Sequence, residues 1–179
     1  MNRIGIAQFE KVSFDQWKND LLSGDLKDMY SRFPDIQLKK IYDSIKLPKR
    51  ATTGSAGYDF FLPVPILDIP TNSAITIPTG IRCKMDEGWV LKIYPRSGHG
   101  FKYGVHLANS CGIIDADYYG ANNEGHINVK LVNDSLLKKH IELNQGDAFC
   151  QGVFVPYGIT VDDEVSAKRV GGMGSTDNK

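Results

Sequence analysis

The chain has 179 residues, of which 41% are hydrophobic, and its 21 basic and 21 acidic residues give a formal net charge of zero. This length suits one domain that buries about 70% of its unfolded surface. The balanced charge excludes a global basic field of the kind that holds nucleic acid or a membrane surface, so neither partner is expected.

The cysteines and the N-terminus set the expected compartment. Cys83, Cys111 and Cys150 are widely spaced and form no CxxC pair or Cys/His cluster, which favours reduced structural thiols over a zinc site. The first residues lack the apolar run of a signal peptide, and no apolar stretch approaches the roughly 20 residues of a membrane span. We therefore expect a soluble, cytoplasmic protein.

The first predicted element is a helix over residues 13–33. Ser13 and Gln16 have the spacing of a capping box, and apolar residues then recur at helical spacing. Pro34 is expected to end this helix. Residues 1–37 are interpreted as an N-terminal helical extension.

Short β-type runs follow, separated by Gly, Pro, Asn and Asp, and they begin with the run 41–47. The run 126–131 alternates cleanly, which puts its odd-numbered residues on one face. Turn signals about every 8 to 12 residues favour an antiparallel sandwich or barrel over residues 38–168. Residues 169–179 form a glycine-rich arm that is expected to be mobile without a ligand.

The segment 107–120 concentrates the chemistry of the chain. In an extended strand Asp115 and Asp117 would point to the same face, because side chains alternate with period two. We expect a hairpin whose carboxylate is held at a pocket edge. The residues that could bind a flat heterocycle, contact a sugar and orient a water are Asn109, Ile113, Ile114, Asp115, Asp117 and Tyr118.

Four further stretches carry candidate residues, each with a structural alternative. Asp59 in SAGYDF either hydrogen-bonds within a turn or holds a water of a hydrated Mg²⁺. Arg96 in YPRSGHG can bind phosphate oxygens together with Ser97 and the glycine amides. Gln151, inside a strand at 149–155, makes a structural bond or shares the water with Asp115.

The fourth stretch is RVGGMGST, at residues 169–176. Its glycines let backbone amides approach phosphate closely, and Arg169, Ser175 and Thr176 add donors. It lacks the P-loop spacing, so the alternatives are a disordered tail and a lid that orders on a triphosphate.

Five stretches resemble, in this order, the five motifs of the trimeric dUTPase family. They are AGYD, PRSG, GIIDADY, the strand that carries Gln151, and GGxGST. The resemblance covers about residues 36–176. It implies a jelly-roll-like all-β fold, and the predicted N-terminal helix is an addition outside the family's common core. It also implies a homotrimer with sites at subunit interfaces, and hydrolysis of dUTP to dUMP and pyrophosphate with Mg²⁺.

The resemblance implies a role for each matching residue. Asp115 would activate the water, and Asp59 would assist the metal through water. Asn109 and the backbone of 113–115 would read the uracil, and Tyr118 would pack on the deoxyribose. The full set expected to bind substrate is Arg96, Ser97, Gly98, Asn109, Ile113, Ile114, Asp115, Tyr118, Gln151, Arg169, Met173, Gly174, Ser175 and Thr176.

The chain departs from the family pattern in three places. Met173 stands where an aromatic usually stacks on uracil, residues 119–124 look inserted, and Ala148 or Phe149 is near the place of a missing arginine. Two alternatives stay open. One is a dCTP deaminase or bifunctional deaminase-dUTPase, and the other is a regulatory binding protein whose contact surfaces would be the helix and the insertion.

Overall fold

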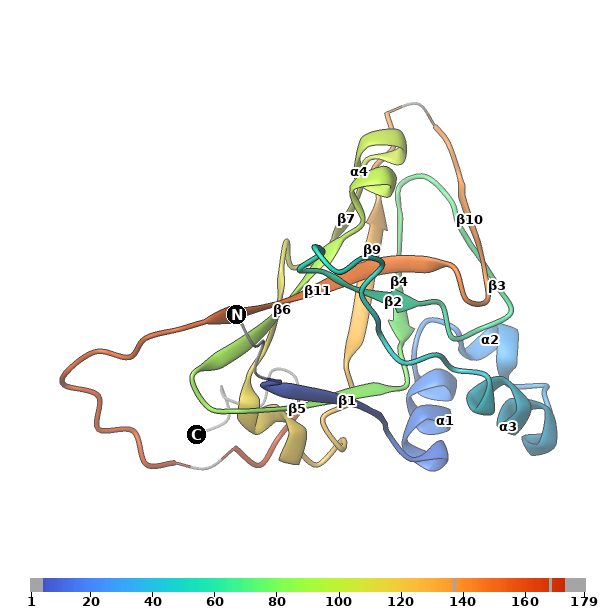
Figure 1. Cartoon of the computed structure of the whole chain (residues 1–179). Coiled ribbons are helices and arrows are strands. Elements are labelled where there is room, and N and C mark those ends of the chain that lie inside the picture. The colour runs from blue at the N-terminus through green and yellow to red at the C-terminus, as the bar shows by residue number, and fades with distance from the viewer. Residues whose placement is uncertain (1–4, 137, 168, 173–179) are drawn as a thin grey trace.

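A computed structural model describes residues 5–136, 138–167 and 169–172, and most of the regular secondary structure in these ranges is antiparallel β structure (Figure 1). Every strand pairing within these residues is antiparallel, which confirms the predicted fold class. The sheets have the strand orders β2 (Tyr58–Phe61), β11 (Ala148–Pro156), β6 (Trp89–Pro95), β8 (Gly112–Ile114); β4 (Ser73–Pro78), β9 (Asn128–Asn133), β7 (Val105–Leu107); β1 (Ala7–Lys11), β5 (Ile81–Met85); and β3 (Ile66–Ile69), β10 (Ile141–Asn144).

The inward faces of these sheets share one apolar core. Val129 and Leu131 of β9 are buried whereas Lys130 between them is exposed, so the predicted alternation is confirmed. Leu91 of β6 and Phe149 of β11 are fully buried in the same core. The outward residues of β9 are therefore free to line a surface site.

The N-terminal helical region differs from its prediction. Instead of one helix there are three, α1 (Phe14–Ser23), α2 (Lys27–Tyr30) and α3 (Asp35–Asp43), which lie together in Figure 1, where α1 contacts β4 as well as the other two helices. Gly24 ends α1, where its backbone N–H donates to the Asp20 carbonyl. Pro34 precedes α3 with φ −67°, a value already suited to a helix start, so it begins a helix rather than ending one.

α3 runs across the expected boundary between residues 37 and 38. The start of the run 41–47 is therefore helical, and the prediction of a strand there was wrong. The cap of α1 was predicted correctly, since Ser13 Oγ accepts from Gln16 N at 3.1 Å. The reciprocal half of the capping box is absent, because Ser13 N donates instead to the Glu124 carboxylate.

Two connecting elements complete the description, the helix α4 (Ser97–Tyr103) and the 3₁₀ helix η1 (Ala116–Gly120). After β11 the chain leaves the body as a long extended segment and then returns toward η1 (Figure 1). Among the described residues, no helix has both the length and the apolar character needed to cross a membrane.

Candidate functional site

A cavity of about 620 Å³ lies where β8 and η1 meet the outward face of β4 and β9. One wall comes from the segment that the sequence singled out, with Asn109, Ile113, Ile114, Asp115 and Tyr118, and Arg169 of the arm closes it. The structure thus brings together six of the predicted site residues.

The segment 107–120 is not the expected hairpin. β7 pairs with β9 and β8 pairs with β6, so residues 108–111 form a turn that joins two different sheets. The Ala108 N–H donates to the Lys130 carbonyl at 3.0 Å, and Ser110 adopts a left-handed φ of 63°. The correction matters because, among the described residues, β8 has a strand partner on one edge only, and β8 lies beside the cavity.

Close approach of β8 to β6 explains the glycine at the start of β8. A Cβ on Gly112 would lie 3.1 Å from the Cβ of Ile93, tighter than ordinary packing. The register places Gly112 opposite Ile93 and Ile114 opposite Leu91, which is fully buried. This packing holds Asp115, directly after the strand, at a fixed place on the rim.

Asp115 and Asp117 meet through a different geometry from the one predicted. Asp115 precedes η1 and Asp117 lies within it, so they do not share one face of a strand. Arg169 joins them instead, with Nη2 2.7 Å from Asp115 Oδ2 and Nε 3.0 Å from Asp117 Oδ1. A guanidinium that bridges two exposed carboxylates can exchange them for phosphate oxygens.

Tyr118 forms a buried part of the same wall. Its hydroxyl donates to the His126 carbonyl at 2.9 Å and accepts from Asn123 Nδ2 at 2.8 Å, while burial raises its pKa. The Arg169 guanidinium carbon lies 5.5 Å from the ring centroid. Because its hydroxyl is committed to protein partners, Tyr118 offers a ligand its ring.

Asp59, Arg96 and Gln151 form a second group. Arg96 Nε lies 3.4 Å from Asp59 Oδ1, and Gln151 is opposite Asp59 in the β2–β11 register. Gln151 Nε2 donates to the Pro95 carbonyl at 3.3 Å, and a Cβ on Gly57 would lie 2.7 Å from Gln151 Oε1. A side chain at position 57 would therefore displace this amide.

This second group does not line the cavity. Ser97 and Gly98 open α4 directly after Arg96, so they belong with it. The two groups are connected by β6, whose middle pairs with β8 and whose end leads to Arg96. The predicted site residues thus divide into six that line the cavity and a second group that does not.

Of the predicted arm residues, Arg169 is placed at the cavity, while Met173, Gly174, Ser175 and Thr176 lie outside the described residues. The start of the arm rests on the 119–124 segment. The Asn122 N–H donates to the Val170 carbonyl at 3.1 Å, and Gly172 lies close to the side chain of Asn123.

Sequence reasoning missed part of the cavity. Thr76, Asn128 and Lys130 line it from β4 and β9, and Cys111 lines it from the turn. The alternation of β9 was a usable signal, since it already placed Asn128 and Lys130 on the face opposite the apolar residues. A second cavity of about 700 Å³ shares Asp115 and Arg169 with the first and adds Glu87 and Asp117.

Among the described residues no cluster of three or more His, Cys, Asp or Glu side chains could hold a metal by itself. Mg²⁺ keeps several of its waters and is usually bound by one or two carboxylates together with phosphates of a ligand. Asp59, with its side chain one-fifth exposed beside Arg96, is a carboxylate of that kind. The residues present therefore fit a substrate-borne Mg²⁺.

The family model described as dUTPase matches residues 43–177. The chain belongs to the dUTPase family. It is 39% identical over 135 residues to the deoxyuridine 5'-triphosphate nucleotidohydrolase of Lactococcus lactis, covering 74% of this chain and 88% of that protein.

Solved structures agree with this family. The dUTPase of Streptococcus mutans superposes with a TM-score of 0.58 at 37% identity, over 66% of this chain and 90% of that one. A variant dUTPase from phage phi11 of S. aureus, described as coordinating a structural Mg(II) ion, has a TM-score of 0.60 at 17% identity. That comparison covers 91% of this chain and 98% of the phage protein, and shows the shared fold.

Proposed function

We propose that this dUTPase-family chain hydrolyses dUTP to dUMP and pyrophosphate. The observation that carries the proposal is Asp115 on the rim of a nucleoside-sized cavity, beside the ring of Tyr118 and the edge of β8 that has no strand partner among the described residues. A pyrimidine can hydrogen-bond to that edge in the way a neighbouring strand would. Uracil presents a donor between two acceptors, so a matching edge leaves buried groups unpaired against cytosine, which can cost about 10⁴-fold in specificity.

Asp115 is proposed to orient and deprotonate the attacking water. A positioned carboxylate base contributes roughly 10²- to 10⁴-fold in rate. In the described structure its Oδ2 accepts from Arg169 Nη2 at 2.7 Å, so one of its oxygens is already occupied by a donor. Transfer of Arg169 to a phosphate oxygen would free Asp115 at the moment the substrate is bound.

The remaining rate acceleration is proposed to come from charge neutralisation and alignment at the triphosphate. Arg96, Ser97 and Gly98 would donate to phosphate oxygens, and Gln151 would help to place ligand or water. Mg²⁺ bound to the substrate would offset phosphate charge, with Asp59 holding one of its waters. The arm residues Met173, Gly174, Ser175 and Thr176 would close the site.

A homotrimer with sites between subunits is part of the proposal. It is supported by the division of the predicted residues between the cavity and the Arg96 group, because a second copy could bring the two together. The three unpaired cysteines fit a reducing compartment, and we place the enzyme in the cytoplasm.

The test is pyrophosphate release from dUTP, dCTP, dTTP and UTP, each with Mg²⁺. Fast release from dUTP alone is expected, and equal rates on all four would rule the proposal out. Deaminated product from dCTP would instead support the deaminase alternative.

A matched pair of variants tests the role of Asp115. Asp115→Asn should keep nucleotide binding and lose about 10²- to 10⁴-fold in kcat. Asp117→Asn removes the other carboxylate that Arg169 contacts, outside the first cavity, so it should lose much less. Equal losses in the two variants would show that Asp115 matters only as a partner of Arg169.

A further inference from the structure

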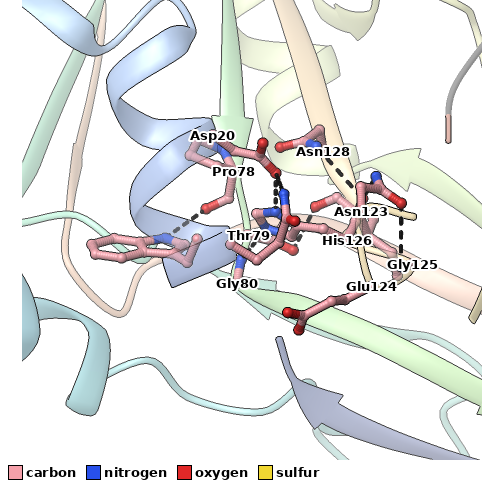
Figure 2. A network of polar contacts seen from close by, with 12 residues as sticks. Asp20, Pro78, Thr79, Gly80, Asn123, Glu124, Gly125, His126 and Asn128 are labelled. Carbon is pink, nitrogen blue, oxygen red and sulfur yellow. Dashed lines mark hydrogen bonds and ion pairs between the residues drawn. The ribbon is translucent and has the colours of Figure 1, made fainter. Parts of the chain in front are cut away.

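A fully buried histidine, His126, contacts Asp20 of helix α1 (Figure 2). The Gly80 backbone N–H donates to His126 Nε2 at 2.8 Å, and His126 Nδ1 lies 2.5 Å from Asp20 Oδ2. A backbone N–H can only donate, so Nε2 is unprotonated and Nδ1 carries the proton to the Asp20 carboxylate. Asp20 and Gly80 therefore fix the ring in one tautomer and one orientation.

The backbone of the same histidine holds the residue expected to contact the sugar. The His126 carbonyl accepts from the Tyr118 hydroxyl at 2.9 Å, and that hydroxyl in turn accepts from Asn123. Because Tyr118 lines the cavity, a shift of His126 moves the cavity wall. The path from Asp20 to the cavity consists of two hydrogen-bonded residues.

Asp20 is placed to act as a carboxylate. Burial raises the pKa of Asp20, but hydrogen bonds with His126 and Gln16 lower this pKa by more than burial raises it. The net pKa is therefore below the ordinary value. Gln16 Nε2 donates to the same Oδ2 atom at 3.0 Å, from one turn earlier in α1. The carboxylate is thus ionised and oriented from its own helix.

A second link joins the start of α1 to the 119–124 segment. Ser13 N and Oγ donate to the two carboxylate oxygens of Glu124 at 2.7 and 2.6 Å. Glu124 adopts a left-handed φ of 58°, and Asn122 in the same segment binds the arm through Val170. The helix therefore contacts the insertion that also supports the arm.

We infer that Asp20 is a positioning residue for nucleotide binding, acting through His126 on Tyr118, and that the N-terminal helices support the nucleotide site. The inference rests on the proposed function. α1 lies before residues 43–177, the part matched by the family model, so this support is separate from the matched region.

The experiment compares Asp20→Ala, Asp20→Asn and the control Asp35→Ala. Asp20→Ala leaves a buried N–H without its charged acceptor, so KM for dUTP should rise about tenfold with kcat changed less than about threefold. Its preference for dUTP over UTP should fall, since Tyr118 is expected to contact the sugar. Asp20→Asn keeps an oxygen that accepts from Nδ1–H and should restore KM to within about threefold of wild type.

Asp35→Ala controls for disturbance of the helices. Asp35 pairs with Lys18 at 2.6 Å, between α3 and α1, away from the cavity. It should keep the wild-type KM. A wild-type KM for Asp20→Ala, an equal rise in Asp35→Ala, or no recovery in Asp20→Asn would each overturn the inference.

Two further measurements keep the inference testable on its own. Nitrogen-15 NMR of the imidazole should show His126 protonated at Nδ1, and protonation at Nε2 would overturn it. If Asp20→Ala does not fold, Asp20→Glu takes its place, because it displaces the carboxylate by one methylene. Asp20→Glu should raise KM more than Asp20→Asn does. A wild-type KM in both Asp20→Glu and Asp20→Asn would overturn the inference. Wild type that neither hydrolyses nor binds any of the four nucleotides would instead contradict the proposed function, while the NMR result still decides the Asp20–His126 link.

Discussion

Cys111 is the one cysteine of the three that lies on the cavity wall. Cys83 and Cys150 are buried, and burial raises the pKa of Cys83 to about 12 and that of Cys150 well above its ordinary value. Thiol reactivity needs both access and the thiolate form. Among the three thiols, a thiol reagent in the cavity therefore meets only Cys111.

We expect an aromatic disulfide reagent to label one thiol per native chain, at Cys111. A non-hydrolysable dUTP analogue should slow this labelling at least about tenfold, because the nucleoside would cover the turn at 108–111. Mass spectrometry of the labelled peptide checks the position, and Cys111→Ser is the control. Labelling that the analogue leaves unchanged would mean that the nucleotide binds elsewhere.

At the scale of elements, carboxylates connect the N-terminal helical region to the β domain through hydrogen bonds. Asp25 accepts from the Thr76 N–H at 2.8 Å, Asp20 binds His126, and Glu124 binds Ser13. Hydrogen bonds from Thr76 lower the pKa of Asp25. Burial raises the pKa of Asp20 and of Glu124, but their hydrogen bonds outweigh it, so both values are lowered.

A carboxyl group whose pKa is lower in the folded protein makes the free energy of unfolding depend on pH. Its stabilisation is complete above the unfolded pKa of about 4 and is lost as the pH falls through the lower folded value. Urea unfolding at pH 7 and at pH 3 should therefore give a smaller difference in unfolding free energy for Asp20→Asn/Asp25→Asn/Glu124→Gln than for wild type. An equal difference would show that these groups do not fasten the helices.

The elements also show which features the sequence could predict. Alternation predicted β9 and its buried face, and Ser13 predicted the start of α1, because both signals are local. The break at Gly24 was missed because one glycine costs a helix only about 1 kcal/mol, and the apolar periodicity continues past it. The pairing of β8 with β6 and of β7 with β9 depends on distant partners, so the sequence of 107–120 alone suggested a hairpin.

The site shows the same division between local and distant information. Asp115, Asn109 and Tyr118 were predicted as neighbours, and the structure places them on one cavity. The contact of Arg169 with Asp115 spans 54 positions, and that of His126 with Asp20 spans 106. Such contacts follow from tertiary packing, which no short motif encodes.

At the scale of the whole molecule, Arg96 does not line the cavity that Asp115 lines, and this suggests a test of how the active site is shared. If each active site takes Asp115 from one copy and Arg96 from another, a chain with an intact Asp115 can contribute to an active site even when its own Arg96 is replaced. The same holds for a chain with an intact Arg96 and a replaced Asp115. A light-scattering mass of three times the 19.9 kDa chain mass is the first expectation. The stronger test uses two inactive variants together.

Arg96→Ala and Asp115→Asn should each lose most activity alone. Unfolded together in equal amounts and refolded, they should recover about one quarter of the wild-type activity, because random assembly pairs an intact Asp115 with an intact Arg96 at that fraction of shared sites. Mixing the folded variants without unfolding is the control, and it should recover activity only as fast as subunits exchange. A refolded mixture that forms trimers yet stays as inactive as its components would place both residues in a site within one chain, and the cavity and the Arg96 group would then have to approach each other by a movement of β6 and β8.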